Sequence, residues 1–322
     1  MSYFIFGGSG FIGTHLIALI DNLYPGIKIY NLDIVENNHE GKSTYINCDV
    51  RSEINIDIPV TSEDVIFNFA AVHRTPGHPD QAYFETNIRG AENVCAFAEK
   101  FGIKKIVFTS SIAPYGAAED LKTEETLPTP NTPYGISKLV AEKIHTIWQA
   151  KKSNERQLTI VRPGVVFGKG ENGNFTRLYW GIRGGKFFYP GRKDTIKACI
   201  YVKELVRFML YRLENHSEGV ELYNCTFEPA FTIEQIVETM KKATGLQRTI
   251  VKVPGSLLMT VASIVGPLGG KALGICPARV KKLMISTNIC GKKLADSGYK
   301  FHYTFEEAIK DWYRDNDNKY LR

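Results

Sequence analysis

The sequence has few features that would support metal sites, disulfides or secretion. Its six cysteines, at positions 48, 95, 199, 225, 276 and 290, form no CxxC pair and no spacing typical of metal ligands. Most of them lie in apolar contexts, as small buried thiols do, which indicates a reducing compartment. The start Met1-Ser2-Tyr3 lacks the basic region of a signal peptide. We therefore expect no metal and a cytoplasmic protein.

Long apolar runs are scarce as well, with one exception. Residues 253–270 (VPGSLLMTVASIVGPLGG) carry no charge over 18 residues, the lower limit for a membrane span. The segment holds two prolines and four glycines, so its helix-compatible part is only about 11 residues long. We interpret it as a buried or interfacial helix of a second domain and do not expect the protein to associate with membranes.

A strong charge imbalance is also absent. The chain has 40 basic and 34 acidic residues, a net charge of +6, and the excess lies in short clusters such as Lys151-Lys152. Solvated helix faces explain these clusters better than a nucleic-acid site does, so no nucleic-acid partner is expected. The mild positive balance also suits an anionic, phosphate-bearing substrate.

Alternating strand and helix patterns fill the first half of the 322-residue chain. Strands are predicted near residues 3–6, 28–32, 65–69, 105–109 and 159–162, with helices near 11–23, 82–101 and 133–151. This alternation predicts an α/β fold with a Rossmann-type doubly wound parallel sheet. Helices near 202–213, 233–244 and 305–315 indicate a smaller α/β part. We expect an NAD-binding domain over 1–166 and a mainly substrate-binding domain over 167–322, from which a strand and a helix can return to the first sheet.

The stretch GGSGFIG, residues 7–13, follows the first strand directly and opens a helix. In this setting Gly7 forms the tight turn, Gly10 lets the backbone approach a pyrophosphate, and Gly13 lets the helix pack on the strand. Phe11 and Ile12 begin the helix, whose N-terminus faces the phosphate charge. The pattern predicts a dinucleotide site.

Asp33 stands 20 residues after Gly13, at the end of the second strand. A carboxylate there accepts hydrogen bonds from the adenosine ribose and repels a 2′-phosphate. No arginine follows in residues 34–38, so the pattern predicts NAD rather than NADP. Asp49 and Val50, after an expected third strand, are candidates for a contact with the adenine.

A YxxxK motif begins the helix that follows Pro133. The i, i+4 spacing places Tyr134 and Lys138 on one face of this helix. A tyrosine pKa near 10 must fall by about three units for the phenol to act as a base at neutral pH, and a nearby lysine with an oxidised nicotinamide can supply that shift. Ser111, at the end of the preceding strand, adds a hydroxyl to the set.

These motifs together resemble the extended short-chain dehydrogenase/reductase family, and within it the NAD-dependent epimerase/dehydratase group that acts on nucleotide sugars. The similarity continues through FAA at 69–71, NIRG at 87–90, VRPG at 161–164 and IYVKEL at 200–205. It covers almost the whole chain and is specific for the superfamily rather than for one substrate.

The resemblance implies roles for the three polar residues. Ser111 holds the sugar oxygen, Tyr134 exchanges its proton, and Lys138 tunes Tyr134 and binds the nicotinamide ribose. Hydride then passes between a substrate carbon and the nicotinamide. The resemblance also implies cofactor contacts for Phe69, Ala70, Ala71, Asn87 and Pro163.

The residues after Ser111 restrict the chemistry. Ile112 and Ala113 stand where similar sugar 4,6-dehydratases carry an Asp-Glu pair, and where decarboxylating relatives carry a glutamate and 3,5-epimerase/reductases a cysteine at the second position. Neither side chain can transfer a proton. What is left is reversible oxidation at one carbinol. The function favoured by the resemblance is a nucleotide-sugar 4-epimerase in the synthesis of surface polysaccharide precursors.

Three alternatives stay open. Val165 stands where 4-epimerases usually have an asparagine near the diphosphate, which leaves room for a 4-ketoreductase or dehydrogenase. A 3β-hydroxysteroid-dehydrogenase-like enzyme acting on a lipid-like alcohol is the second, and residues 253–270 would then face the membrane. The third is an NAD-sensing binding protein, although a sensor has no need of Ser111, Tyr134 and Lys138.

Substrate contacts are predicted from later segments and from one loop. By resemblance Asn174 and Phe175 form a backbone clamp on the diphosphate, and Lys197 takes the place of a diphosphate-binding arginine. His73 and Arg74 follow a strand at the sheet's carboxyl edge, where loops face the substrate. Helices near 87–101 and 134–151 resemble a four-helix interface, so a homodimer is expected.

Overall fold

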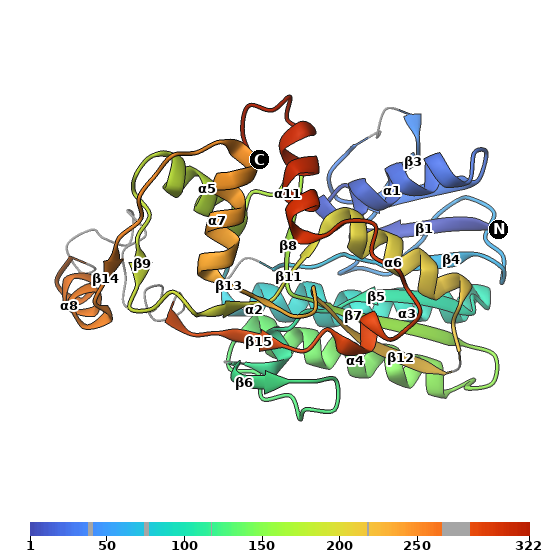
Figure 1. Ribbon diagram of the computed structural model, residues 1–322. Coiled ribbons are helices and arrows are strands. Elements are labelled where there is room, and N and C mark those ends of the chain that lie inside the picture. The colour runs from blue at the N-terminus through green and yellow to red at the C-terminus, as the bar shows by residue number, and fades with distance from the viewer. Residues whose placement is uncertain (38–40, 74–76, 117, 218, 266–283) are drawn as a thin grey trace.

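The computed structural model describes the chain except for residues 38–40, 74–76, 117, 218 and 266–283. Its centre is a parallel sheet of seven strands with helices on both faces (Figure 1). The strand order is β12-β7-β5-β4-β1-β2-β3. This confirms the predicted Rossmann-type α/β fold. The strands are β1 Ser2–Phe6, β2 Lys28–Asp33, β3 Thr44–Asn47, β4 Val65–Asn68, β5 Lys105–Thr109, β7 Gln157–Pro163 and β12 Val220–Cys225.

Two helical layers enclose this sheet. On one face α1 (Phe11–Leu23) packs against α6 (Val202–Glu214), and on the other α3 (Arg89–Phe101) packs against α4 (Pro133–Ala150). Apolar side chains of β1 and its neighbours alternate between the two layers, because successive residues of a strand point to opposite faces. Ile5 and Phe67 therefore belong to the core under α1 and α6, whereas Phe4 and Phe6 belong to the core under α3 and α4.

The helix predicted over residues 82–101 is interrupted. It consists of α2 (Asp80–Tyr83), one π-helical turn η2 (Phe84–Ile88) and α3. A π-helical turn has i→i+5 hydrogen bonds and so adds a bulge to the α-helix, which changes the direction of the neighbouring side chains. The predicted helix is present, and the wide turn inside it is a feature that its sequence pattern did not indicate.

The second part of the molecule has smaller sheets and its own core. A mixed sheet has the order β13-β10-β15-β6, and two strand pairs are β11-β8 and β14-β9. In the core the Phe167 ring stacks on Phe175 with centroids 4.7 Å apart and contacts Trp312. The strands are β6 Ala118–Lys122, β8 Val165–Phe167, β9 Tyr189–Pro190, β10 Ile196–Lys197, β11 Cys199–Tyr201, β13 Phe231–Thr232, β14 Lys252–Val253 and β15 Thr287–Ile289, and the helices are η3 Ala113–Tyr115, α5 Asn174–Arg183, α7 Ile233–Thr244, α8 Gly255–Val265, α10 Lys292–Ala295 and α11 Phe305–Arg314.

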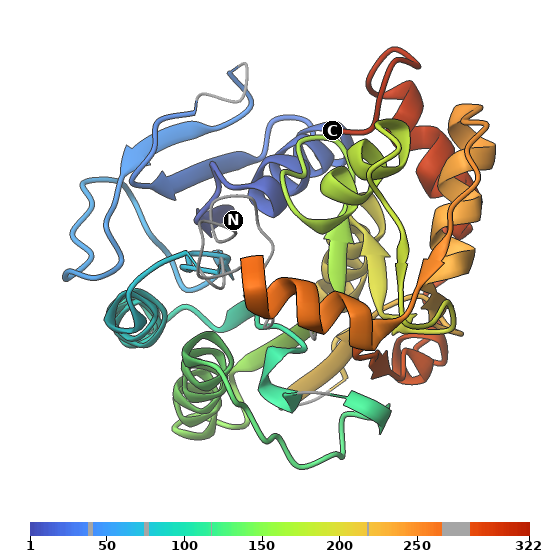
Figure 2. The same ribbon diagram turned by 90° about the vertical axis from the view of Figure 1, so that its left-hand side faces the viewer.

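The uncharged segment noted in the sequence contains α8, a helix of 11 residues. Among the described residues no helix combines the length and apolar character that crossing a bilayer requires. The strands of the large sheet run from right to left in Figure 1, and Figure 2 views the molecule from the side of their carboxyl ends, where α8 lies toward the viewer.

Candidate active site

The turn between β1 and α1 takes its shape from its glycines. Gly7 has a φ of +77°, and a Cβ there would lie 2.7 Å from the backbone nitrogen of Ala70. A Cβ on Gly13 would lie 2.5 Å from the Cα of Gly8, so only glycine lets α1 pack this closely on the turn. Gly10 precedes the helix, and no side chain caps it there. The N-terminus of α1, where Phe11 and Ile12 lie, thus fits a pyrophosphate group.

The carboxylate of Asp33 lies beside this turn. One of its oxygens accepts a hydrogen bond from Ser9 N–H and the other from Val35 N–H, each at 3.0 Å. Each carboxylate oxygen has a second acceptor site, so ribose hydroxyls can be bound without breaking these contacts. These acceptor sites fit the ribose hydroxyls in the adenosine half of NAD.

Asp49 and Val50 are positioned by other contacts. The Asp49 carboxylate pairs with Arg51 at 2.6 Å, and its hydrogen bonds with Arg51 hold the pKa of this carboxyl below its usual range. Val50 is buried and lies so near α3 that a Cβ on Gly90 would approach it to 2.8 Å. Both residues follow β3, at the carboxyl edge of the sheet beside β2.

Asn87 joins the loop after β4 to the helix that carries the YxxxK motif. It lies in η2, is buried, and exchanges hydrogen bonds with the backbone of Val72 at 2.8 and 3.0 Å. Its Nδ2 also donates to Ser137 Oγ at 2.8 Å, and Ser137 Oγ donates to Tyr134 O at 2.9 Å. Residues Phe69, Ala70 and Ala71, which were predicted to contact the cofactor, directly precede Val72. The hydrogen bonds of Asn87 therefore hold this loop close to α4.

The start of α4 brings Tyr134 to Ser111. Thr132 caps the helix, its Oγ1 accepting a hydrogen bond from Gly135 N–H at 3.1 Å, and Pro133 occupies the first helical position. A Cβ on Gly135 would lie 2.7 Å from the carbonyl oxygen of Ala113, so this glycine lets α4 approach the turn after Ser111. As a result the Ser111 hydroxyl lies near enough to the Tyr134 phenol to lower its pKa.

Lys138 lies one turn further along α4 and is 3% exposed. Its Nζ donates to Thr109 O at 2.7 Å and stands 4.7 Å from the centroid of the Phe108 ring. Burial lowers the pKa of Lys138 to about 7, while the charge of Glu142 opposes this change. The structure thus brings together the three residues that the motifs pointed to.

Burial also acts on Tyr134, in the direction opposite to the one catalysis needs. It raises the pKa of Tyr134 to about 12. The neighbouring Ser111 hydroxyl acts to lower that pKa, and Tyr83 acts to raise it. The protein alone therefore does not lower the pKa of the phenol to neutrality. A positive charge bound beside Tyr134 is needed for this, because an adjacent cation favours the phenolate.

A buried ionic group behind Lys138 was not identified from the sequence. Glu142, one turn beyond Lys138 on α4, forms a bidentate pair with Arg162 at 2.6 and 2.8 Å. Ser110 Oγ donates to the same carboxylate at 2.5 Å, and the Arg162 guanidinium lies 4.7 Å from the centroid of the Tyr115 ring. One signal was available: Glu142 continues the i, i+4 spacing of the YxxxK motif on the same helical face.

The predicted substrate residues lie in different environments. Asn174 begins α5 and is exposed, while the Phe175 ring is buried in the core, so only the backbone of Phe175 is available to a ligand. Lys197 lies in β10 and donates from Nζ to Ile285 O at 2.7 Å. His73 is exposed, and Arg74 falls outside the described residues.

Pro163 and Val165 mark the junction of the two parts of the molecule. Pro163 ends β7 and accepts a hydrogen bond from Ile112 N–H at 3.3 Å. Val165 N–H donates to Ala198 O at 2.9 Å, and the valine side chain packs against the aromatic core around Phe167. No polar group therefore stands at position 165 to contact a diphosphate.

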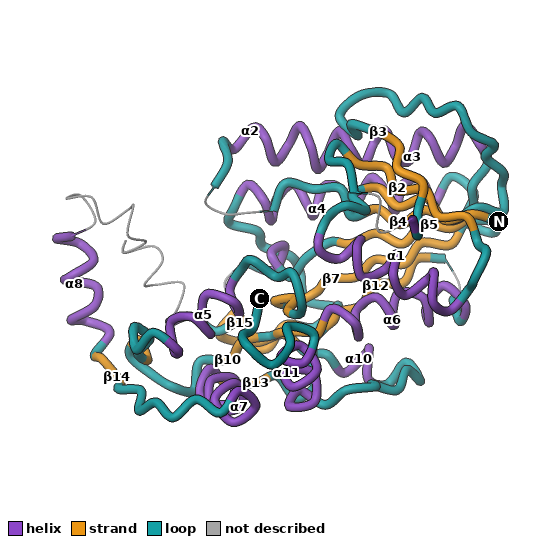
Figure 3. The backbone as a smooth tube through the Cα atoms, turned by 90° about the horizontal axis from the view of Figure 1, so that it is seen from above, coloured by secondary structure: helices purple, strands orange, loops and turns teal. Residues whose placement is uncertain are grey.

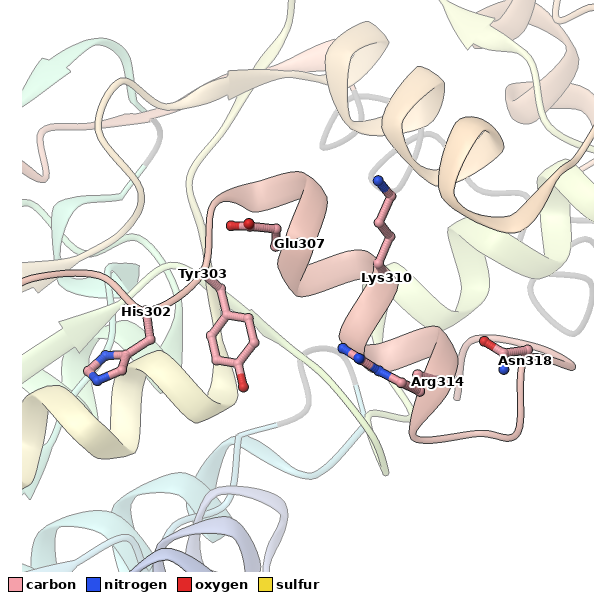
Figure 4. Close-up of a pocket in the computed structure, with 6 residues that line it drawn as sticks. All are labelled: His302, Tyr303, Glu307, Lys310, Arg314 and Asn318. Atoms are coloured by element: carbon pink, nitrogen blue, oxygen red, sulfur yellow. The ribbon is translucent and has the colours of Figure 1, made fainter.

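A concave region elsewhere on the surface contains none of these residues. It has a volume of about 440 Å³ and is lined by six residues of the C-terminal segment, His302, Tyr303, Glu307, Lys310, Arg314 and Asn318 (Figure 4). Its two cations pair with nearby carboxylates: Lys310 with Glu306 at 2.7 Å and Arg314 with Asp311 at 2.9 Å. We assign no part of the chemistry to it.

Comparison with known proteins agrees with this geometry. Residues 3–226 match the NAD dependent epimerase/dehydratase family. The chain belongs to this family. It is 33% identical over 308 residues to the N-acetyl-α-D-glucosaminyl-diphospho-ditrans,octacis-undecaprenol 4-epimerase of Escherichia coli O157:H7, covering 95% of this chain and 92% of the relative.

Two further similarities span most of the chain. A 3β-hydroxysteroid-dehydrogenase/decarboxylase of Arabidopsis thaliana is 25% identical over 340 residues, which is 94% of this chain and 77% of the relative. The UDP-N-acetylglucosamine 4-epimerase structure from Bacillus cereus has a TM-score of 0.73 at 19% identity and covers 98% of both chains. Family membership, NAD dependence and the 4-epimerase type of enzyme predicted from the sequence are confirmed.

Proposed function

We propose that this family member interconverts the two C4 epimers of an N-acetylhexosamine carried on the diphosphate of a polyprenol. The carrier is inferred from the relative whose name includes a diphospho-undecaprenol, because that similarity extends over nearly the full length of both proteins. Val165 supports it, because by resemblance UDP-sugar 4-epimerases usually carry an asparagine at this position, whereas the valine side chain packs against the aromatic core.

The observation that carries the reaction type is the close approach of the start of α4, which carries Tyr134 and the buried Lys138, to the turn after Ser111. Ser111 holds the C4 oxygen, and Tyr134 takes the proton of the C4 hydroxyl and later returns it. Bound NAD supplies a reversible acceptor for the C4 hydride. With Ile112 and Ala113 after Ser111, the set has no second acid or base at those positions, so the sugar is oxidised and reduced at one carbon without elimination.

Lys138 and the surrounding residues position these groups. We assign the ribose of the nicotinamide to Lys138, the pyrophosphate to the turn at Gly7, Gly10 and Gly13, and the adenosine ribose to Asp33. The other proposed cofactor contacts are Phe11, Ile12, Asp49, Val50, Phe69, Ala70, Ala71, Asn87 and Pro163. On the substrate side we assign the diphosphate to the backbone at Asn174 and Phe175, with His73 and Lys197 nearby in the site.

Cofactor retention distinguishes the epimerase from a ketoreductase. An epimerase that released NADH midway would strand a keto sugar, so the purified protein should contain NAD and turn over without added nucleotide. Absorbance at the NADH band should not change during turnover, and Tyr134→Phe should abolish activity while leaving bound NAD. Empty cofactor sites, with turnover only on added NADH and a keto sugar, would establish the ketoreductase instead.

The carrier is tested by paired substrates that share the same sugar. N-acetylglucosaminyl-diphospho-farnesol and UDP-N-acetylglucosamine are each incubated with the protein, and the C4 epimers are separated by chromatography. We expect kcat/KM to be at least about tenfold higher for the farnesyl substrate, since a specificity difference of about 1.4 kcal/mol corresponds to this factor. Equal or better turnover of the UDP-sugar would assign the protein to nucleotide-sugar epimerisation.

A further inference from the structure

A helix with an apolar sequence, α8, projects from the end of the molecule to which the parallel strands point. In Figures 1 and 3 α8 lies beyond the carboxyl ends of the large sheet, next to β14. Its start is anchored, because a Cβ on Gly255 would lie 2.8 Å from Met284 Sδ. Beyond this anchor the Leu257 side chain is 54% exposed.

Neighbouring strands extend this apolar region. Tyr189 N–H donates to Val251 O at 2.9 Å and Gly191 N–H donates to Val253 O at 2.8 Å, so β9 and β14 hold the flanking segments together. Phe188, just before β9, is 38% exposed, and Val251, just before β14, is 61% exposed. These side chains come from neighbouring elements, and exposed apolar side chains that cluster mark candidate binding surfaces.

The two segments that carry these side chains contain no acidic residue, although Glu234 and Glu238 of α7 lie near enough to Tyr189 to raise its pKa. The sequence has no Asp or Glu between Glu238 and Asp296, and none between Glu171 and Asp194. Lys186, Arg248 and Lys252 are exposed, and none of them takes part in an ion pair with any described residue. We name the six residues Lys186, Phe188, Arg248, Val251, Lys252 and Leu257 the β14–α8 surface.

We propose that the β14–α8 surface docks the protein on an anionic lipid bilayer. Unpaired lysine and arginine beside exposed leucine and phenylalanine are typical of segments that lie in the membrane interface. A protein partner fits less well, because lysine is depleted in protein–protein interfaces. This proposal differs from the expectation from the sequence that the protein does not associate with membranes.

The orientation of the docked protein gives this surface a use. The Tyr134 end of α4 and the glycine turn both lie at the carboxyl edge of the sheet, on the side from which α8 projects (Figure 3). A bilayer bound at α8 therefore faces the site, and a sugar attached to a membrane-embedded polyprenol can enter with its lipid left in the membrane. This link to catalysis rests on the proposed function, whereas the binding itself does not.

Vesicle sedimentation with the full-length protein tests the docking. The probes are vesicles of phosphatidylcholine alone and vesicles in which about one third of the lipid is phosphatidylglycerol. Each cation near an anionic surface strengthens binding roughly fivefold, so the triple variant Lys186→Gln/Arg248→Gln/Lys252→Gln should bind the anionic vesicles about 100-fold more weakly. Leu257→Glu should weaken binding by about tenfold through loss of the inserted side chain.

A matched control variant also removes three positive charges, but at the opposite end of the large sheet. Lys28→Gln/Lys100→Gln/Lys104→Gln alters exposed lysines near the amino ends of the strands and should leave vesicle binding unchanged. All variants should keep the wild-type kcat on a water-soluble sugar substrate, which shows that they are folded. Equal binding to neutral and anionic vesicles, or undiminished binding by the β14–α8 variants, would overturn the proposal. Vesicle binding by a protein that epimerises only UDP-sugars would overturn the polyprenol substrate alone.

Discussion

Burial of the Lys138 ammonium makes the stability of this protein depend on pH above neutrality. The pKa of Lys138 falls from its ordinary 10.5 to about 7 in the folded protein, and burial is the largest cause. Between these two pH values the unfolded chain binds more protons than the folded one, so the free energy of unfolding rises with pH in that window. Below pH 7 both states are protonated and the cost of burying the cation is present in full.

Replacement of the lysine should remove this dependence. In Lys138→Met the free energy of unfolding, relative to the unmodified protein, should fall as the pH rises from 7 to about 9, by up to about 1.4 kcal/mol per pH unit. The window is free of His145, whose pKa burial lowers to about 4. Urea denaturation at several pH values measures the effect, and the exposed Lys151→Met is the control. A difference that does not change with pH would show that Lys138 stays charged in the folded protein.

Asp33 should decide the choice between the two nicotinamide cofactors. Because it accepts hydrogen bonds from Ser9 and Val35 as well as facing the glycine turn, Asp33→Ala should weaken NAD binding by about 10- to 100-fold, the value of one or two hydrogen bonds to a charged group. Asp33→Arg should shift the preference toward NADP. Isothermal calorimetry on protein stripped of nucleotide measures both affinities. The control is Asp57→Asn, at an exposed aspartate that is not among the proposed cofactor contacts. Equal affinities of the unmodified protein for NAD and NADP would contradict the role of Asp33.

The site residues that the sequence predicted are brought together by spacing within one helix or by a position at a strand end. The site residues that it did not predict meet only in the folded chain. Tyr134 and Lys138 share a helical face that the spacing alone defines, and Ser111 was placed by its position at a strand end. Arg162 meets Glu142 only because β7 pairs with β5 beside α4. Contacts of this kind depend on strand register and helix packing, which no local pattern contains.

Between elements, the Glu142–Arg162 pair connects α4 to β7. Both side chains are almost fully buried, so Glu142→Gln leaves the Arg162 charge unpaired and should lower the free energy of unfolding by about 3–5 kcal/mol. The variant should also lower the pKa of Lys138 further, since Glu142 holds it up, and the limb of the pH–rate profile that reports Lys138 should move to lower pH.

A double variant separates the buried charge from the packing. Glu142→Leu/Arg162→Met removes both charges and should recover most of the stability lost in Glu142→Gln, because uncharged side chains of similar volume avoid the desolvation penalty. Urea denaturation compares the three proteins. If the double variant is less stable than Glu142→Gln, the pair contributes through its hydrogen bonds to Ser110 and its contact with Tyr115 rather than through charge balance.

The start of a helix was predictable where capping residues mark it. The π-helical turn η2, which interrupts the helix predicted over residues 82–101, was not predictable. Thr132 and Pro133 define the start of α4, and Thr304 with Glu307 forms a capping box at the start of α11. The turn η2 carries no comparable signal. Its Asn87 side chain bonds to the Val72 backbone and to Ser137, so tertiary hydrogen bonds accompany the wide turn, and they become visible only in the folded chain.

At the scale of the whole molecule, the alternation of strand and helix patterns in the sequence predicted the large parallel sheet. It did not predict the smaller mixed sheet. β6 pairs with β15 although more than 160 residues separate Ala118 from Thr287, and each of these strands is short. Pairings at such separation are selected by the packing of the complete chain, not by propensity. β12 differs from these strands: it joins the large sheet beside β7, and a strand returning from the second part of the chain was among the expectations from the sequence.

The outer face of α4 leads to a prediction about assembly. Ile136 is 40% exposed and Ile147 is 59% exposed, and their separation of 11 residues returns to the same face of a helix. Together with α3 this face fits a four-helix contact with a second copy, in agreement with the homodimer expected from the resemblance. Apolar side chains in such a contact are buried on association, and an introduced carboxylate would lose hydration without a partner.

Ile136→Glu/Ile147→Glu should therefore convert a dimer into a monomer at micromolar concentration, as measured by light scattering. The matched control is Leu121→Glu, at a leucine on β6 that is 56% exposed and lies outside α3 and α4; it should stay dimeric. Because the Ser111, Tyr134 and Lys138 side chains come from one chain, the monomeric variant should keep its bound NAD. An unmodified protein that is monomeric in the same measurement, or a double variant that stays dimeric, would show that α3 and α4 do not form the interface.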